Sequence, residues 1–282
     1  MRVISYRAEG GDRAAVQTPA GVLDAGDLLG EGPTGVRELL AAGRLGELDE
    51  AARGAEDRAL DRDRIELRPP VPDPGKIVCL GLNYRSHAEE AGLEPPEAPT
   101  FFAKFRNALA PSGAAVALPA ASEKVDYEAE LAFVIGSRCR EVEPEQALDA
   151  VAGYMLFNDL SARDLQFATP QWMPGKVFDD SAPCGPALVT PDEAGPHDGI
   201  SFELTLNGET MQSAASSDLL FSVPELVSRL SRLMTLEPGD MVATGTPAGV
   251  GSVRKPRVWL QPGDEIVIAS PTLGRLETRI AR

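Results

Sequence analysis

Two short acidic stretches carry the residue types best suited to chemistry. In the first, 126–131 (DYEAEL), Glu128 and Glu130 are two apart, so in a strand they project from one face and leave the other face to apolar residues. A third acid, Asp159, follows the apolar run 151–157. Acids beside a predicted core need partners, because an unpaired buried charge is costly. A hard divalent cation, which prefers oxygen ligands, is the partner that this pattern favours.

Such a site suits an oxo acid. Three carboxylates around a divalent ion leave a net charge of about −1, and octahedral Mg²⁺ then has about three open positions. A 2-oxo acid fills two of them with its carboxylate and keto oxygens, and water fills the last. The competing interpretation is a solvated strand face, since exposed acids are common.

His87 and Glu90 form a second candidate group. They are three residues apart on a short predicted helix, so their side chains can meet. A carboxylate beside an imidazole raises its basicity and fixes its tautomer, which gives a general base for water. A surface histidine with an incidental neighbour is the alternative.

Lys176 lies in a predicted turn, 172–176, where it can stabilise an oxyanion or enolate, although a loop lysine is commonly exposed. The glycine-rich loop 245–251 (GTPAGVG) follows a predicted strand, and its amides and the Thr246 hydroxyl can hold a carboxylate or phosphate. The alternative is a turn that needs positive φ. The loop matches neither the P-loop nor the dinucleotide pattern.

The elements that must position these residues fall into two predicted units. Residues 1–70 read as short strands at 1–6 and 14–17, followed by helices over 35–60. A cluster of prolines then predicts a linker, so 71–282 is the expected catalytic domain.

In that second unit, 76–80 is a predicted buried strand, and Asn83 is expected to cap a helix that runs to Glu90 and ends at Gly92. Residues 145–156 are helical in pattern.

Turn signals define the last third of the chain. Asn207-Gly208 predicts a hairpin, and Ser222 with Glu225 forms a capping box before an amphipathic helix. The similar phrases 237–240 (EPGD) and 261–264 (QPGD) each predict a tight turn before a strand. Strands outnumber helices after residue 75 without strict alternation, which favours a mixed, mainly antiparallel sheet.

Composition limits the partners. The 282 residues include 43% hydrophobic residues and carry a net charge of −16, so neither nucleic acid nor an anionic membrane is an expected partner. An anionic substrate would need a locally positive site. Three scattered cysteines suit reduced thiols, and no signal-peptide core or long apolar run is present, so we expect a cytoplasmic protein.

Taken together and in order, these motifs resemble the fumarylacetoacetate hydrolase family over roughly residues 75–282. The phrases that carry the resemblance are 81–90 (GLNYRSHAEE), 126–131 (DYEAEL), 158–166 (NDLSARDLQ), Gly175-Lys176 and 243–251 (ATGTPAGVG).

The resemblance implies an α+β, mainly β fold, a mixed β-sandwich roll with a small N-terminal α+β domain, and commonly a homodimer. It implies Mg²⁺, replaceable by Mn²⁺ or Ca²⁺, on Glu128, Glu130 and Asp159. It further implies that His87 and Glu90 activate water on a segment that orders over the substrate, and that Lys176 faces the oxyanion. The substrate-binding residues that it implies are Gln166, Gly245, Thr246 and, for the far carboxylate, Arg106.

The activity that follows is a Mg²⁺-dependent hydrolase that cleaves a C–C bond of a 2,4-dioxo acid, of the acylpyruvate or fumarylpyruvate type, via a metal-bound enolate. The alternatives are a decarboxylase of an oxaloacetate-like acid, or an isomerase of a 2-hydroxyhepta-2,4-diene-1,7-dioate or hydroxymuconate-type compound. A non-catalytic metal-binding protein is the alternative from another class. Phe105 stands where many relatives have proline, and such departures argue against fumarylacetoacetate itself.

Overall fold

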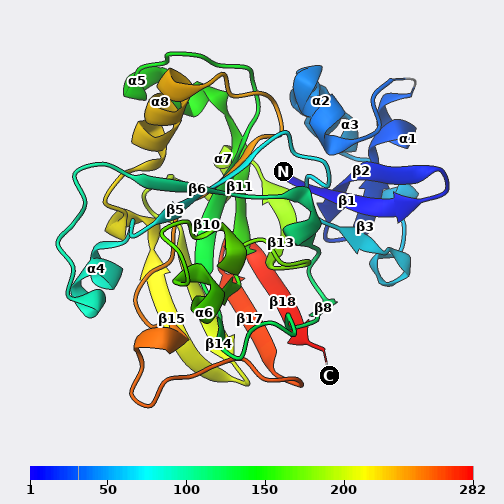
Figure 1. Ribbon diagram of the computed structural model, residues 1–282. Helices are drawn as coiled ribbons and strands as arrows, with labels where there is room; N and C mark the ends of the chain where they lie inside the picture. Colours follow the sequence, from blue (N-terminus) through cyan, green and yellow to red (C-terminus); the bar gives the residue numbers. More distant parts are fainter. Residues whose placement is uncertain (31, 282) are drawn as a thin grey trace.

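A large mixed sheet runs through the centre of the molecule, as the computed structural model of residues 1–30 and 32–281 shows (Figure 1). The main path of this sheet, in spatial order, is β3 (Gly21–Asp24), β2 (Gly11–Thr18), β1 (Arg2–Ala8), β13 (Ala182–Val189), β11 (Val151–Asn158), β10 (Ala129–Ile135), β16 (Met241–Ala243), β5 (Ile77–Gly81) and β6 (Thr100–Lys104). Two short strands lie off this path: β4 (Leu67–Arg68) pairs with β1, and β7 (Leu109–Ala110) pairs with β13.

A second sheet packs against the first, and a two-stranded ribbon lies beside them. The ribbon pairs β9 (Val125–Asp126) with β12 (Ser161–Ala162). The second sheet runs in the order β15 (Glu209–Ala215), β14 (Ser201–Leu206), β17 (Glu265–Ser270), β18 (Gly274–Ile280) and β8 (Ala114–Val116).

Strand β10 separates two cores because its side chains alternate between its faces. Leu131, Phe133 and Ile135 join the core shared with the second sheet, while Ala132 and Val134 join the core under the N-terminal helices. Glu128 and Glu130 have the same parity as Ala132, so they lie on that second side.

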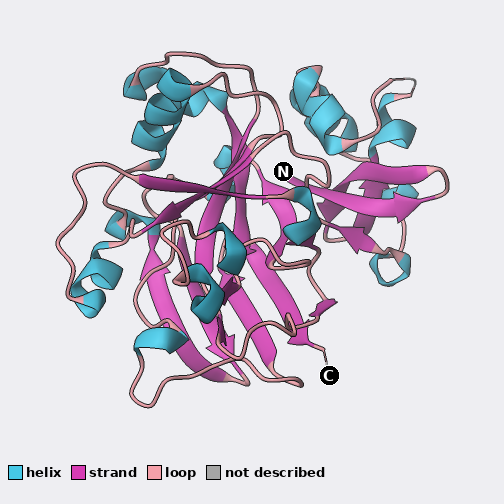
Figure 2. Ribbon diagram, in the orientation of Figure 1, coloured by secondary structure: helices cyan, strands magenta, loops and turns pink. Residues whose placement is uncertain are grey.

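The helices are short and peripheral (Figure 2). Their bounds are α1 (Ala25–Leu29), α2 (Val36–Ala41), α3 (Leu45–Ala52), α4 (Arg85–Ala91), α5 (Pro144–Ala147), α6 (Arg163–Gln166), α7 (Pro191–Ala194) and α8 (Val223–Leu233). No described helix is long and apolar enough to cross a membrane. The mainly β, mixed and largely antiparallel fold is as predicted.

Several local predictions are confirmed. The hairpin β14–β15 turns at Asn207 and Gly208, which both have positive φ, and α8 begins with the capping box of Ser222 and Glu225. Each of the two similar turns precedes a strand, β16 or β17. The boundary at residue 70 stays a prediction, and strand β1 pairs directly with β13.

Two local predictions are wrong. The segment 145–156 is helical only up to Ala150, and its remainder is β11, whose residues are all buried. A short, continuously apolar run satisfies a helical and a buried-strand pattern equally, and tertiary pairing decides between them. Asn83 does not cap α4; its side chain instead bonds the backbone of Thr244 and Phe221. Gly92 does end α4, in the left-handed conformation.

Candidate metal centre and active-site cavity

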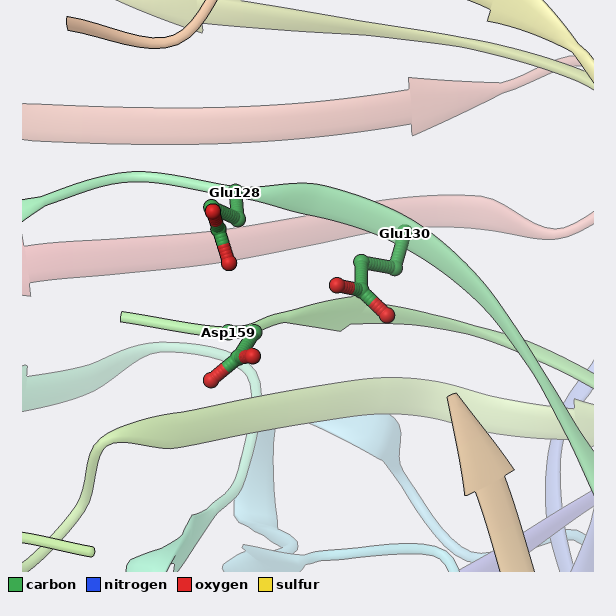
Figure 3. Close-up of side chains that lie close together, drawn as sticks. All are labelled: Glu128, Glu130 and Asp159. Atoms are coloured by element: carbon green, nitrogen blue, oxygen red, sulfur yellow. The ribbon is translucent and has the colours of Figure 1, made fainter. Parts of the chain in front are cut away.

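The three buried carboxylates of Glu128, Glu130 and Asp159 converge at the place where β10 begins and β11 ends (Figure 3). Ala129 pairs with Asn158, and the Asp159 amide donates to the Glu128 carbonyl at 2.9 Å, so this register places Asp159 beside Glu128. One carboxylate oxygen from each of Glu128, Glu130 and Asp159 lies within 4.8 Å of the others. The structure thus brings together the three predicted metal ligands.

Two buried lysines complete one side of this cluster. Lys176 Nζ lies 2.6 Å from Glu128 Oε2 and 2.7 Å from Asp159 Oδ2. Lys104 Nζ lies 2.7 Å from Asp159 Oδ1. Burial opposes the charged form of Lys176, but Asp159 and Glu128 outweigh it and raise the pKa of the ammonium. Lys176 therefore stays protonated beside the predicted metal ligands.

Arg163 completes the other side. Its guanidinium lies 2.7 Å from Glu128 Oε1 and 2.8 Å from Asp126 Oδ2, and it donates to the Gln166 side chain at 3.0 Å. Burial opposes ionisation of Glu128, but Arg163 and Lys176 outweigh it and hold the pKa of that carboxyl below its usual range. Arg163 therefore contacts both a predicted metal ligand, Glu128, and a cavity residue, Gln166.

Glu130 differs from the other two acids. It accepts a hydrogen bond from the Gly245 amide at 2.8 Å, and among the described residues it has no ion-pair partner. Burial, with Asp159 and Glu128 nearby, raises the pKa of Glu130 well above its usual value. A buried carboxylate that lacks a cation of its own is the group that a divalent ion would satisfy.

The charge balance of the cluster also fits a metal. Asp126 and the three converging acids carry four negative charges when all are ionised. The three buried cations Lys104, Lys176 and Arg163 oppose them, which leaves a net charge of about −1. A divalent ion changes this to about +1, which suits the carboxylate of an incoming acid.

His87 and Glu90 lie on α4, and Glu90 ties this helix to the glycine-rich loop. Both Glu90 carboxylate oxygens accept from the Gly249 amide, at 3.0 and 3.1 Å. His87 Nδ1 is 3.6 Å from Glu90 Oε2 and has no hydrogen-bond partner, so the predicted pair is adjacent without being hydrogen-bonded. Catalytic hydrogen bonds often shorten only when a ligand binds.

A cavity of about 670 Å³ lies beside the acidic cluster, and Glu128 is the one acid of the converging three among its lining residues. His87, Glu128, Lys176, Gln166 and Thr246 all line it. Its remaining polar or aromatic lining includes Phe102, Lys124, Arg163, Asp164, Trp172, Ser252, Arg257 and Trp259.

Three of the predicted substrate-binding residues, Gln166, Gly245 and Thr246, already make hydrogen bonds to other protein groups. The Gln166 side chain is engaged by Arg163, and the Thr246 hydroxyl donates to the Ala129 carbonyl at 2.9 Å while it accepts from Gln212. Thr246 thus has no free proton for a substrate. The Gly245 amide serves Glu130 rather than the cavity.

Arg106 is not at the cavity. It is exposed in the short helical turn Arg106–Ala108 after β6, and it lines a different depression, together with Arg37 and Asp73. Arg106 is not among the residues that line the cavity, so the structure does not support its predicted contact with a far carboxylate.

Sequence reasoning missed three charged residues of the cluster: Lys104, Asp126 and Arg163. Asp126 lies in the motif 126–131 and Arg163 in the motif 158–166, but nothing in the sequence indicated that the two side chains form an ion pair. Lys104 ends the apolar strand β6, and a lysine in that position was the available signal.

Comparison with known proteins supports one family. The family model described as fumarylacetoacetate (FAA) hydrolase C-terminal matches residues 76–281. Oxaloacetate tautomerase YisK of Bacillus subtilis is 42% identical over 77% of this chain and 73% of its own length. The mitochondrial oxaloacetate tautomerase fahd2 of Xenopus laevis is 36% identical over 88% of this chain and 79% of its own length.

Solved structures agree. A putative HpcE protein from Mycobacterium smegmatis is 35% identical with a TM-score of 0.88, covering 100% of this chain and 99% of that one. Maleylpyruvate hydrolase from Sphingobium, in complex with manganese(II) and pyruvate, is 29% identical with a TM-score of 0.82 over 100% and 99% of the two chains.

Proposed function

Because this chain belongs to the fumarylacetoacetate hydrolase family, we propose that it is a divalent-metal-dependent isomerase that interconverts the keto and enol forms of a small 2-oxo dicarboxylic acid. Oxaloacetate is the first candidate substrate. The observation that carries this proposal is the similarity to two oxaloacetate tautomerases across about three quarters of their length. This choice takes the reaction type of the isomerase alternative and the oxaloacetate-like acid of the decarboxylase alternative, in place of the C–C bond hydrolysis that the sequence analysis put first.

The metal is proposed to be Mg²⁺, with Mn²⁺ or Ca²⁺ as substitutes, held by Glu128, Glu130 and Asp159. When bound, it would supply Lewis-acid polarisation of the substrate's 2-oxo group. Arg163 holds Glu128 in position, and the Gly245 amide holds Glu130.

Lys176 provides the positive charge for the reacting oxygen. Its ammonium lines the cavity, is protonated at neutral pH and is fixed by Glu128 and Asp159. As a proton leaves C3 of the keto acid, negative charge develops on the C2 oxygen, and a preorganised cation stabilises that charge.

His87 is proposed to move the proton between C3 and the C2 oxygen. Its Nδ1 faces Glu90, so Nε2 is the ring nitrogen available to a ligand in the cavity. Glu90 holds α4 against the glycine-rich loop by accepting from the Gly249 amide, and so keeps His87 beside the cavity. One base that accepts and returns one proton is sufficient for tautomerisation.

Hydrolysis is the second candidate. The proximity of His87 and Glu90 suits water activation, and maleylpyruvate hydrolase shares the fold at 29% identity. Decarboxylation of an oxaloacetate-like acid uses the same enolate and needs no water.

A substrate panel with Mg²⁺ distinguishes these activities. Conversion of the enol to the keto form of oxaloacetate is followed by ultraviolet absorbance, decarboxylation by CO₂ release, and acylpyruvate hydrolysis by release of acid. The proposal expects enol–keto conversion to be the fastest, to fall by roughly 10²–10³ in Lys176→Met, and to be strongly reduced in His87→Ala. Acylpyruvate hydrolysis faster than tautomerisation would reject it in favour of the hydrolase.

The homodimer and the cytoplasmic location stay predictions. The Xenopus relative is named mitochondrial, so relatives of this chain do not all share one compartment, and the location of this chain has to be measured in the cells that produce it. Light scattering in solution measures the assembly, and a mass of about twice 29.9 kDa is the expected result.

A further inference from the structure

We infer that Lys124 and Arg257 form a subsite for the second carboxylate of a dicarboxylic substrate. This inference rests on the proposed function and deepens it, since it states what the far end of the cavity recognises. It also replaces Arg106, which the structure places elsewhere.

Among the described residues, Lys124 and Arg257 are the cavity lysine and arginine without an ion-pair partner. Lys124, Arg163, Lys176 and Arg257 all line the cavity. The side chains of Arg163 and Lys176 are engaged by buried carboxylates. Within the described part of the chain, neither Lys124 nor Arg257 has a carboxylate within ion-pair distance, and both are exposed toward solvent. Their charges are therefore available to a ligand.

Backbone contacts place both residues on one wall. The Leu260 amide donates to the Val125 carbonyl at 2.9 Å, so the segment that follows Arg257 runs beside the segment that follows Lys124. The Val258 amide donates to the Gly251 carbonyl at 3.0 Å, and Asp126 accepts from the Gly251 amide at 2.7 Å. Asp126 thus holds the loop that carries Arg257 against the strand that follows Lys124.

This wall is within reach of the acidic cluster. Lys124 precedes Glu128 by four residues, which sets an upper limit of about 14 Å between their backbones. The long, flexible side chains of Lys124 and Arg257 can shorten the distance between their charged groups and the acidic cluster, which is the distance that a ligand must span. A dicarboxylic acid whose 2-oxo end meets the cluster can therefore extend its second carboxylate toward this wall.

The net negative charge of the protein explains why a dicarboxylate would need such a subsite. With a net charge of −16, the surface repels dianions, so a dianionic substrate needs local positive charge at both of its ends. The cavity lining also includes the aromatic side chains of Phe102, Trp172 and Trp259. Exposed cations at the far end favour a dicarboxylate over an acid with an apolar tail.

Two matched probes test the subsite without turnover. 2-Oxoglutarate and 2-oxopentanoate share a five-carbon 2-oxo acid and differ by the second carboxylate; 2-oxoadipate extends the dicarboxylate by one carbon. Calorimetry with Mg²⁺ gives the dissociation constants, and quenching of Trp172 and Trp259, the only two tryptophans, gives an independent readout. Exposed ion pairs are individually weak, so we expect at least one dicarboxylate to bind about tenfold more tightly than 2-oxopentanoate.

The decisive variant is Lys124→Gln/Arg257→Gln, with Arg62→Gln/Arg64→Gln as a control that removes two exposed charges elsewhere. The expected result is that the subsite variant loses the dicarboxylate preference and still binds 2-oxopentanoate as the wild type does, whereas the control keeps the preference. A preference that persists in the subsite variant, or that the wild type lacks, overturns the inference. Oxaloacetate tautomerisation by the wild type is measured separately, so failure of the subsite and failure of the proposed function give different results.

Discussion

Replacing Lys176 by methionine is predicted to weaken the fold and strengthen metal binding together. The ammonium lies 2.6 Å from Glu128 and 2.7 Å from Asp159 in a fully buried cluster. Breaking a buried ion pair costs about 3–5 kcal/mol. Because Glu128 keeps Arg163 and Asp159 keeps Lys104, we expect the lower end, about 3 kcal/mol, and a fall in Tm of roughly 6–12 °C.

The same variant removes a positive charge from the predicted metal site. A cation beside the ligands repels a divalent ion and competes for their oxygens, so its loss is expected to lower the Kd for Mn²⁺ by roughly tenfold, about 1.4 kcal/mol. Activity is expected to fall by roughly 10²–10³, because the charge facing the developing oxyanion is gone. Tighter metal binding with lost activity is a combination that general misfolding does not produce.

Differential scanning calorimetry with EDTA and with Mn²⁺ measures both effects. Lys76→Met is a matched control, because Lys76 Nζ lies 2.6 Å from the buried Asp240, outside the acidic cluster. The control is expected to lose stability but to gain as much from Mn²⁺ as the wild type does, while Lys176→Met gains more. Weaker or unchanged Mn²⁺ binding in Lys176→Met would refute the reasoning.

Three more predictions test other parts of the site. Burial and its acidic neighbours raise the pKa of Glu130, so its contribution to stability is complete below about pH 4.5 and is lost as pH rises through the raised value. Because Mn²⁺ binds the carboxylate form, proton release on Mn²⁺ binding should be larger in the wild type than in Glu130→Gln. Calorimetry in buffers of different ionisation enthalpy, repeated across a pH series, measures this difference. Asn83→Ala removes three buried hydrogen bonds and should cost about 2–4 kcal/mol in denaturant unfolding. Glu90→Ala frees α4 from the Gly249 amide and should lower kcat without changing metal affinity, whereas Glu90→Gln keeps an acceptor and should retain the wild-type KM; a large loss of metal affinity in Glu90→Ala would contradict this assignment.

The acidic cluster was accessible from the sequence because local rules create it. Alternation along a strand puts Glu128 and Glu130 on one side. Asp159 was a candidate because it follows an apolar run, although that run was predicted to be helical and is the strand β11. The turns and the capping box were equally local, since glycine, asparagine and proline set the backbone at those positions.

Features that depend on tertiary pairing were not accessible in the same way. The run that forms β11 fits a helix until neighbouring strands pair with it. Asn83 has the chemistry of a helix cap, but the backbone of two distant segments competes for its side chain. The contacts of Lys104 with Asp159 and of Arg163 with Asp126 span 55 and 37 residues, and no spacing rule predicts them.

The most direct test of the account is a crystal structure grown with Mn²⁺ and analysed by anomalous scattering. The account predicts one ion whose protein ligands are carboxylate oxygens of Glu128, Glu130 and Asp159, facing the cavity that Lys176 lines. An anomalous peak elsewhere, or no peak at the cluster, would contradict it.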